Sequence, residues 1–250
     1  RSRPGATGVL AGLAVLTRPA ALLPALLLAA GGGSRRRAGA VGAGLLLVLA
    51  PWLVRTTWMH GRPLLTTNSG ATLVGGNSAA TAAERPPGRW LPPDEVYAGA
   101  PDAPDLGIWG WSALGEAGSD ARFATDAVAW IAAEPGAAAA LAVSKLARLV
   151  DPDPHSRRAD AGTKRLVGWL TLPPVLLLAL SGVLALRRRP AAATSGTGWG
   201  PWIALAAGTC VTVVVFYGDT RMRATADPSL LAVAGVGLDA LLPRRAVAPG

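Results

Sequence analysis

The sequence predicts an all-α membrane protein, a polytopic transmembrane helical bundle with an extracytoplasmic region of loops and helices. Three observations predict this fold class. First, 51% of the 250 residues are hydrophobic and only 16% are charged, against about 25% charged in a typical soluble domain. Second, the apolar residues come in blocks that approach or reach the roughly 20 residues a helix needs to cross a bilayer. Third, arginines cluster at the ends of those blocks.

The first apolar block, residues 5–33, is interrupted near its middle by Thr17-Arg18-Pro19. Proline disfavours a continuous helix and biases the residue before it away from helical angles. One long helix with a buried arginine fits the pattern, and so does a pair of short helices that meet at Arg18-Pro19. We prefer the pair, because it places the arginines at both ends of the block on one side of the membrane.

Further apolar blocks predict the remaining spans, the last of them short enough to be tilted or interfacial. They are residues 38–58, 166–186, 199–217 and 228–243. The chain therefore divides into three parts. Transmembrane helices occupy residues 1–58, extracytoplasmic loops and amphipathic helices occupy 59–164, and three transmembrane helices occupy 165–245.

The basic clusters predict the orientation of these spans. They are Arg35 to Arg37, Arg187 to Arg189, and Arg244 with Arg245. With alternating spans all three fall on one side, which the positive-inside rule makes the cytoplasm. We therefore expect a multi-pass protein of the plasma (inner) membrane with residues 59–164 outside. The chain begins with Arg1 rather than Met, and we interpret it as part of a longer polypeptide.

Residues 59–164 begin polar and rich in turns. Paired prolines at 86–87 and 92–93 favour an irregular loop. From about Ser119 apolar residues recur at helical spacing, and Pro135-Gly136 separates this helix from a second one at 137–150. We expect two amphipathic helices lying on the outer membrane surface.

Several function classes are disfavoured. The net charge of +9 comes from short clusters without interleaved aromatic residues, so we expect no nucleic-acid partner. The two histidines, His60 and His155, lie far apart, and Cys210 is the single cysteine, so we expect no metal site built from them. The sequence has no phosphate-binding glycine loop and no nucleophile elbow.

Arg18 is the first candidate ligand-binding residue. An ionisable side chain in an apolar block is costly and is a functional hypothesis by default. A guanidinium suits a phosphate because its planar fork donates to two oxygens and stays charged. Snorkelling to the interface is the structural alternative.

More candidates lie at the predicted outer side. Arg55 ends the 38–58 span, and Asn68 and Asn77 stand in a segment rich in hydroxyls, amides and glycines. Asp219 and Arg221 follow the 199–217 span and could form an ion pair or meet a charged headgroup. The predicted topology places these residues on one face, which Arg18 can reach from below.

The order of these motifs resembles a known family. GLAVLTRPAALLP at 12–24, PWLVR at 51–55, TTNSGATLVGGN at 66–77 and FYGDTRMR at 216–223 are similar to the later part of GT-C-type polytopic glycosyltransferases. The closest subgroup is the bacterial one related to protein O-mannosyltransferases and lipid A aminoarabinose transferases. Residues 120–150 also resemble a periplasmic helical segment of that subgroup.

The resemblance implies a sugar transfer from a polyprenyl-phosphate donor at the outer face of a bacterial cell envelope, sometimes with a divalent cation. It implies that Arg18, Arg55 and Arg221 hold the donor phosphate and that Asn68 and Asn77 line the outer cavity. It also implies a catalytic acid upstream of Arg1, so we expect this stretch alone to be inactive.

The sequence departs from the family pattern at four positions. Thr56 and Ser78 stand where asparagines are usual, and Thr220 and Met222 replace a proline and a tyrosine. Two rival functions stay open: a membrane transporter or lipid flippase subunit, and a membrane scaffold without chemistry. A transporter or flippase would also place arginines and broken helices in a membrane cavity.

Overall fold

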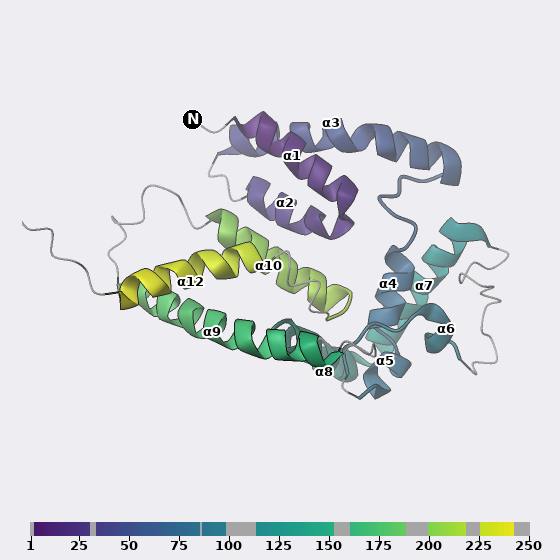
Figure 1. Ribbon diagram of the computed structural model, residues 1–250. Helices are drawn as coiled ribbons and strands as arrows, with labels where there is room; N and C mark the ends of the chain where they lie inside the picture. Colours follow the sequence, from purple (N-terminus) through teal and green to yellow (C-terminus); the bar gives the residue numbers. More distant parts are fainter. Residues whose placement is uncertain are drawn as a thin grey trace, which may run out of the picture.

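The computed structural model describes residues 3–30, 34–85, 87–98, 114–152, 161–188, 200–218 and 226–242. Within these ranges all regular structure is helical (Figure 1). The helices are α1 (Pro4–Thr17), η1 (Pro19–Ala21), α2 (Leu22–Ala30), α3 (Arg35–His60), α4 (Ser69–Gly76), α5 (Ala79–Ala83), α6 (Pro93–Val96), α7 (Gly115–Ala133), α8 (Pro135–Leu149), α9 (Ala161–Arg188), α10 (Gly200–Val215) and α12 (Asp227–Leu241). The all-α prediction is confirmed for this part of the chain.

Two described helices are long and apolar enough to cross a membrane. They are α3, with 26 residues, and the 24-residue stretch Arg165–Arg188 of α9. Both expose large apolar side chains, such as Leu47 on α3 and Leu177 on α9, as helices in lipid do. The bent pair of α7 and α8 passes the same test only if both helices count as one span.

One of the later apolar helices is shorter than the sequence predicts, and the last one is short as predicted. Residues 199–217 were expected to span the bilayer, but α10 has 16 residues and is therefore about 24 Å long at 1.5 Å per residue. The hydrocarbon core is about 30 Å thick. Helix α12, with 15 residues, is shorter still, so the described helices support fewer full spans than the polytopic bundle requires.

The first apolar block is a pair of helices joined by a short break. Helix α1 ends at Thr17, Arg18 has extended backbone angles (φ −145°, ψ 99°), and Pro19 begins the 3-10 turn η1. Proline suits the first position of a helix because an N–H at that position would have no partner within the helix, so its absence costs nothing. The break therefore lies at the Arg18-Pro19 step, and α2 continues from η1.

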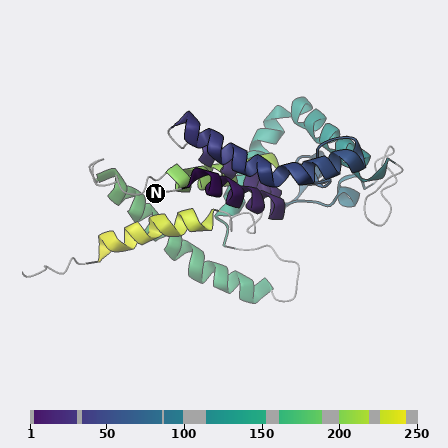
Figure 2. The same ribbon diagram turned by 90° about the horizontal axis from the view of Figure 1, so that it is seen from above.

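Small residues bring the apolar helices into close contact. Gly8 and Gly12 of α1 lie against α3, where a Cβ on either would meet Val41 or Val48. Gly237 of α12 lies against the backbone of α9 in the same way. Figure 1 shows α1 along α3 and α12 beside α9, with α10 between the two pairs, and Figure 2 shows α12 crossing α9. Close backbone approach through glycine is the usual packing mode of helices in lipid.

The polar part of the chain is built around α7. Its buried residues Phe123 and Ala127 pack against Ala71 and Val74 of α4. The chain then turns sharply at Glu134, where α7 and α8 meet at 109°. Proline at the first position of α8 prevents the helix from continuing through the corner.

Helix α4 lies in the polar segment after residue 59, where the sequence predicts turns rather than a helix. Three glycines in α4, Gly70, Gly75 and Gly76, disfavour a helix by intrinsic propensity. In the structure they allow contacts that stabilise it: Gly70 lies against the backbone of α7, and Gly76 lies against Phe216. Tertiary packing thus overrides the local preference.

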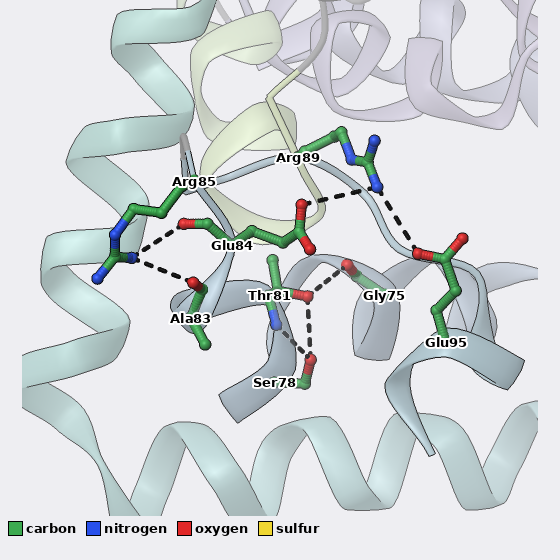
Figure 3. A network of polar contacts seen from close by, with 8 residues as sticks. All are labelled: Gly75, Ser78, Thr81, Ala83, Glu84, Arg85, Arg89 and Glu95. Atoms are coloured by element: carbon green, nitrogen blue, oxygen red, sulfur yellow. Dashed lines mark hydrogen bonds and ion pairs between the residues drawn. The ribbon is translucent and has the colours of Figure 1, made fainter. Parts of the chain in front are cut away.

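Polar contacts hold the turn after α4 in place (Figure 3). The Thr81 hydroxyl donates to the Gly75 carbonyl at 2.8 Å, and Ser78 caps α5 by accepting from the Thr81 N–H at 3.2 Å. Nearby, Arg89 lies between the carboxylates of Glu84 and Glu95 at 3.7 and 3.6 Å. The end of α4 is therefore fixed.

Candidate functional site

A pocket of about 360 Å³ lies where the N-terminal break, the segment before α4 and the end of α10 meet. Three separate parts of the sequence line it. They are Arg18, Pro19, Ala20 and Leu22; Leu65, Thr66, Asn68, Ser69 and Thr72; and Phe216 with Tyr217. We call this the Arg18 pocket. It brings together two of the residues predicted from sequence, Arg18 and Asn68, beside the start of the motif that contains Asp219.

Arg18 is the charged residue of this lining. Its exposed side chain leaves the chain at the extended step between α1 and η1, where helical continuity is already lost. The backbone N–H still bonds to the Ala14 carbonyl at 2.8 Å. A guanidinium is thereby placed on a rigid step, beside the apolar surface of Pro19 and Leu22.

The second wall is anchored to α3. The Trp52 indole donates to the Leu65 carbonyl at 3.1 Å, and the buried Thr56 hydroxyl accepts from the Leu64 N–H at 3.1 Å. Thr56 is one of the departures from the family pattern noted above. Its hydroxyl ties the segment before α4 to α3, so Leu65 and Thr66 are held at the pocket.

Asn68 precedes α4 but does not cap it with its side chain. The Asp120 carboxylate of α7 does so instead, accepting from the Gly70 N–H at 2.5 Å. Burial raises the pKa of Asp120, and the backbone hydrogen bonds from Gly70 and Ala71 oppose that rise. An anion therefore already occupies the α4 N-terminus, where a phosphate would otherwise bind, and Asn68 is left to line the pocket.

The third wall depends on how α10 ends. Lys145 donates to the Val214 carbonyl at 3.0 Å, and Asn77 donates to the Val215 and Phe216 carbonyls at 2.7 and 3.4 Å. The final carbonyls of a helix have no partner within the helix, so such side chains satisfy them. Phe216 and Tyr217 follow directly and form the aromatic wall of the pocket.

The other predicted residues lie elsewhere. Arg55 is exposed on α3 and stacks over the Trp52 ring, with 5.2 Å between its Cζ and the ring centroid. Asn77, expected to line the cavity, is buried and bonded to backbone carbonyls instead. Asp219 and Arg221 fall outside the described residues.

Sequence reasoning missed Lys145, although a signal was present. It lies on α8 midway between Leu141 and Leu149, and all three are buried. Spacing by four residues places them on one helix face, so a lysine in that series was a candidate buried cation. Its exposure is 1%, and burial lowers the pKa of Lys145 to about 8.

A second cavity, of about 270 Å³, lies between α1, η1, α2 and α10. Its lining is apolar and includes Ala14, Pro24, Leu28, Trp202 and Leu205.

Among the described residues no group of three or more His, Cys, Asp or Glu side chains could hold a metal ion.

The chain matches no protein-family model, and neither a curated protein nor a solved structure shows significant similarity to it. The glycosyltransferase resemblance therefore rests on the motifs alone.

Proposed function

We propose that this chain belongs to a multi-pass plasma-membrane glycosyltransferase and binds a polyprenyl-phosphate sugar donor in the Arg18 pocket, at the outer face. The observation that carries the proposal is the meeting of three sequence-distant segments in one pocket with a cation at its edge. Two of those segments supply residues that the sequence patterns had already singled out.

The lining suits the two halves of such a donor. Arg18 offers a guanidinium fork for the phosphate. Thr66, Asn68, Ser69 and Thr72 offer hydroxyls and an amide for sugar hydroxyls, and Phe216 and Tyr217 offer flat apolar faces for the ring. The neighbouring lining is apolar on Pro19 and Leu22, as a lipid-linked ligand needs.

In the transfer, an acceptor hydroxyl attacks the anomeric carbon, loses its proton to a base, and the bond to the phosphate oxygen breaks. Negative charge then grows on the leaving polyprenyl phosphate, which a fixed cation stabilises. The pocket lining contains that cation and no carboxylate among its described residues. Donor binding is therefore the share of the reaction that we assign to this pocket.

Arg18→Ala tests the proposal. Farnesyl phosphate, a short prenyl phosphate, should bind to the parent in detergent micelles and about ten- to a hundredfold more weakly to the variant, because a hydrogen-bonded charge is lost. Arg55→Ala is the matched control, since Arg55 lies outside the lining; its affinity should stay close to that of the parent. Equal affinity of the parent and Arg18→Ala would reject the assignment.

A flippase would bind the same lipid, so binding alone does not separate it from a transferase. Release of free polyprenyl phosphate from a sugar-loaded donor by the full-length protein separates the two. A transferase releases it when an acceptor is present, whereas a flippase moves the intact donor across the bilayer.

A further inference from the structure

The C-terminal end of α10 is held by two buried polar side chains from distant parts of the chain. Lys145, on α8, is 1% exposed, and Asn77, just after α4, is 4% exposed. Lys145 donates to the Val214 carbonyl at 3.0 Å and Asn77 to the Val215 carbonyl at 2.7 Å. Successive carbonyls at the negative end of a helix thus receive donors from two segments that meet only in the folded chain.

The two side chains are also bonded to each other. The Lys145 Nζ donates to the Asn77 Oδ1 at 2.6 Å. Asn77 also donates to the Leu73 carbonyl of α4 at 2.9 Å. Lys145, Asn77 and the end of α10 therefore form one buried network that joins α4, α8 and α10.

The chain beyond α10 is held as far as Gly218. The Gly218 N–H donates to the Gly88 carbonyl at 3.1 Å, and its carbonyl accepts from the Arg148 Nε at 3.1 Å. A Cβ at Gly218 would collide with the backbone of Lys145. Phe216 and Tyr217 are thus held from both sides, by the network before them and by Gly218 after them.

A buried lysine is rare because desolvating an ammonium is costly. An apolar side chain of similar length would fill the same volume without that cost. Such a side chain could not donate to Asn77 and Val214, so the hydrogen bonds rather than the volume account for the choice of residue.

We propose that Lys145 and Asn77 are positioning residues that set the place of the Phe216–Tyr217 wall in the Arg18 pocket. The proposal rests on the proposed function for the identity of the ligand, but not for the placement of the wall.

Three variants at these positions test it. Lys145→Met keeps the length and removes the donors, Lys145→Arg keeps donors, and Asn77→Ala removes the second cap while leaving Lys145 in place. Ser144→Ala, beside Lys145 on α8, is the matched control. Hydrogen exchange of residues 213–218 and affinity for farnesyl phosphate are measured for each full chain in micelles.

We expect Lys145→Met and Asn77→Ala to speed exchange at 213–218 selectively, leaving α1 and α3 unchanged, and to weaken farnesyl phosphate binding about tenfold. Lys145→Arg should recover part of both losses, which a merely space-filling role would not predict. Unchanged hydrogen exchange at residues 213–218 in Lys145→Met and Asn77→Ala would overturn the proposal. Equal exchange rates and affinities in Lys145→Met and Lys145→Arg would also overturn it. So would faster exchange spread evenly over the whole chain.

The two proposals fail in different ways. If the parent itself does not bind farnesyl phosphate while exchange at 213–218 responds as expected, the donor assignment is wrong and the positioning role stands. If the parent binds the probe and the variants alter neither exchange nor affinity, the positioning role is wrong.

Discussion

Asp120 and Lys145 are buried ionisable residues that serve helix ends in other segments. Asp120 of α7 caps the N-terminus of α4, and Lys145 of α8 caps the C-terminus of α10. Each matches the sign of charge that its helix end prefers. Their effect is to bring α4 and α10, which carry two walls of the Arg18 pocket, against the α7–α8 pair.

The titration of Lys145 predicts how stability depends on pH. Burial lowers its pKa from 10.5 to about 8 in the folded chain. Between about pH 8 and 10.5 the unfolded chain therefore binds more protons than the folded chain, so the free energy of unfolding rises with pH in this window. The part of the unfolding free energy that is gained in this window is lost again as the pH falls through about 8.

Urea unfolding of the parent and of Lys145→Met at several pH values between 7 and 11 measures this effect. The other titrating groups are common to both proteins, so the difference between their unfolding free energies isolates Lys145. That difference should grow in favour of the parent as pH rises. A constant difference across the window would show that Lys145 is not desolvated in the folded chain.

At the scale of helices, contacts through glycine decide which pairs form. On α12, Gly237 lies against the backbone of α9, whereas Gly235, two residues earlier, has nothing within 4 Å of a built Cβ. The two positions differ in tertiary contact while sharing one helix, so they form a matched pair for mutation.

Gly237→Ala should destabilise the folded chain by about 1–3 kcal/mol, because the new methyl group must displace the α9 backbone. Gly235→Ala should be neutral or stabilising by up to about 1 kcal/mol, since alanine is the better helix former. Thermal unfolding in detergent micelles measures both. Equal effects of the two substitutions would mean that α12 does not pack on α9 through this face.

The same scale shows which elements could be predicted from the sequence. Helices α3 and α9 follow directly from long apolar runs, and the break at Arg18 follows from the proline beside it. Helix α4 could not be predicted, because its cap, Asp120, lies 50 residues away in the sequence. The role of Asn77 was equally hidden: the carbonyls that it bonds are 138 and 139 residues away.

The residues of the candidate site also differ in whether their position could be predicted from the sequence. Arg18 and Asn68 were predicted from local sequence and both line the pocket. Arg55 was predicted from its place at the end of a span, but its side chain is exposed, stacks over Trp52 one turn earlier on the same helix, and does not line the pocket. Rotation about a helix axis depends on packing against neighbours, which a hydrophobic run does not specify.

At the scale of the whole molecule, the account depends on α3 and α9 crossing the bilayer. Helix α3 begins with Arg35 to Arg37, and helix α9 ends with Arg187 and Arg188. The positive-inside rule places these ends in the cytoplasm. In the orientation we propose, the opposite end of α3, the Arg18 pocket and the α7–α8 pair lie at the outer surface.

Cysteine labelling measures this arrangement most directly. Two single-cysteine variants in a Cys210→Ser background are used: Glu134→Cys, at the exposed corner between α7 and α8, and Arg36→Cys, at the exposed start of α3. With a membrane-impermeant maleimide on intact bacterial cells, Glu134→Cys should be labelled, and Arg36→Cys should be labelled only after the membrane is opened. Labelling of Arg36→Cys in intact cells with protection of Glu134→Cys, or recovery of the chain in the soluble fraction without detergent, would contradict the account.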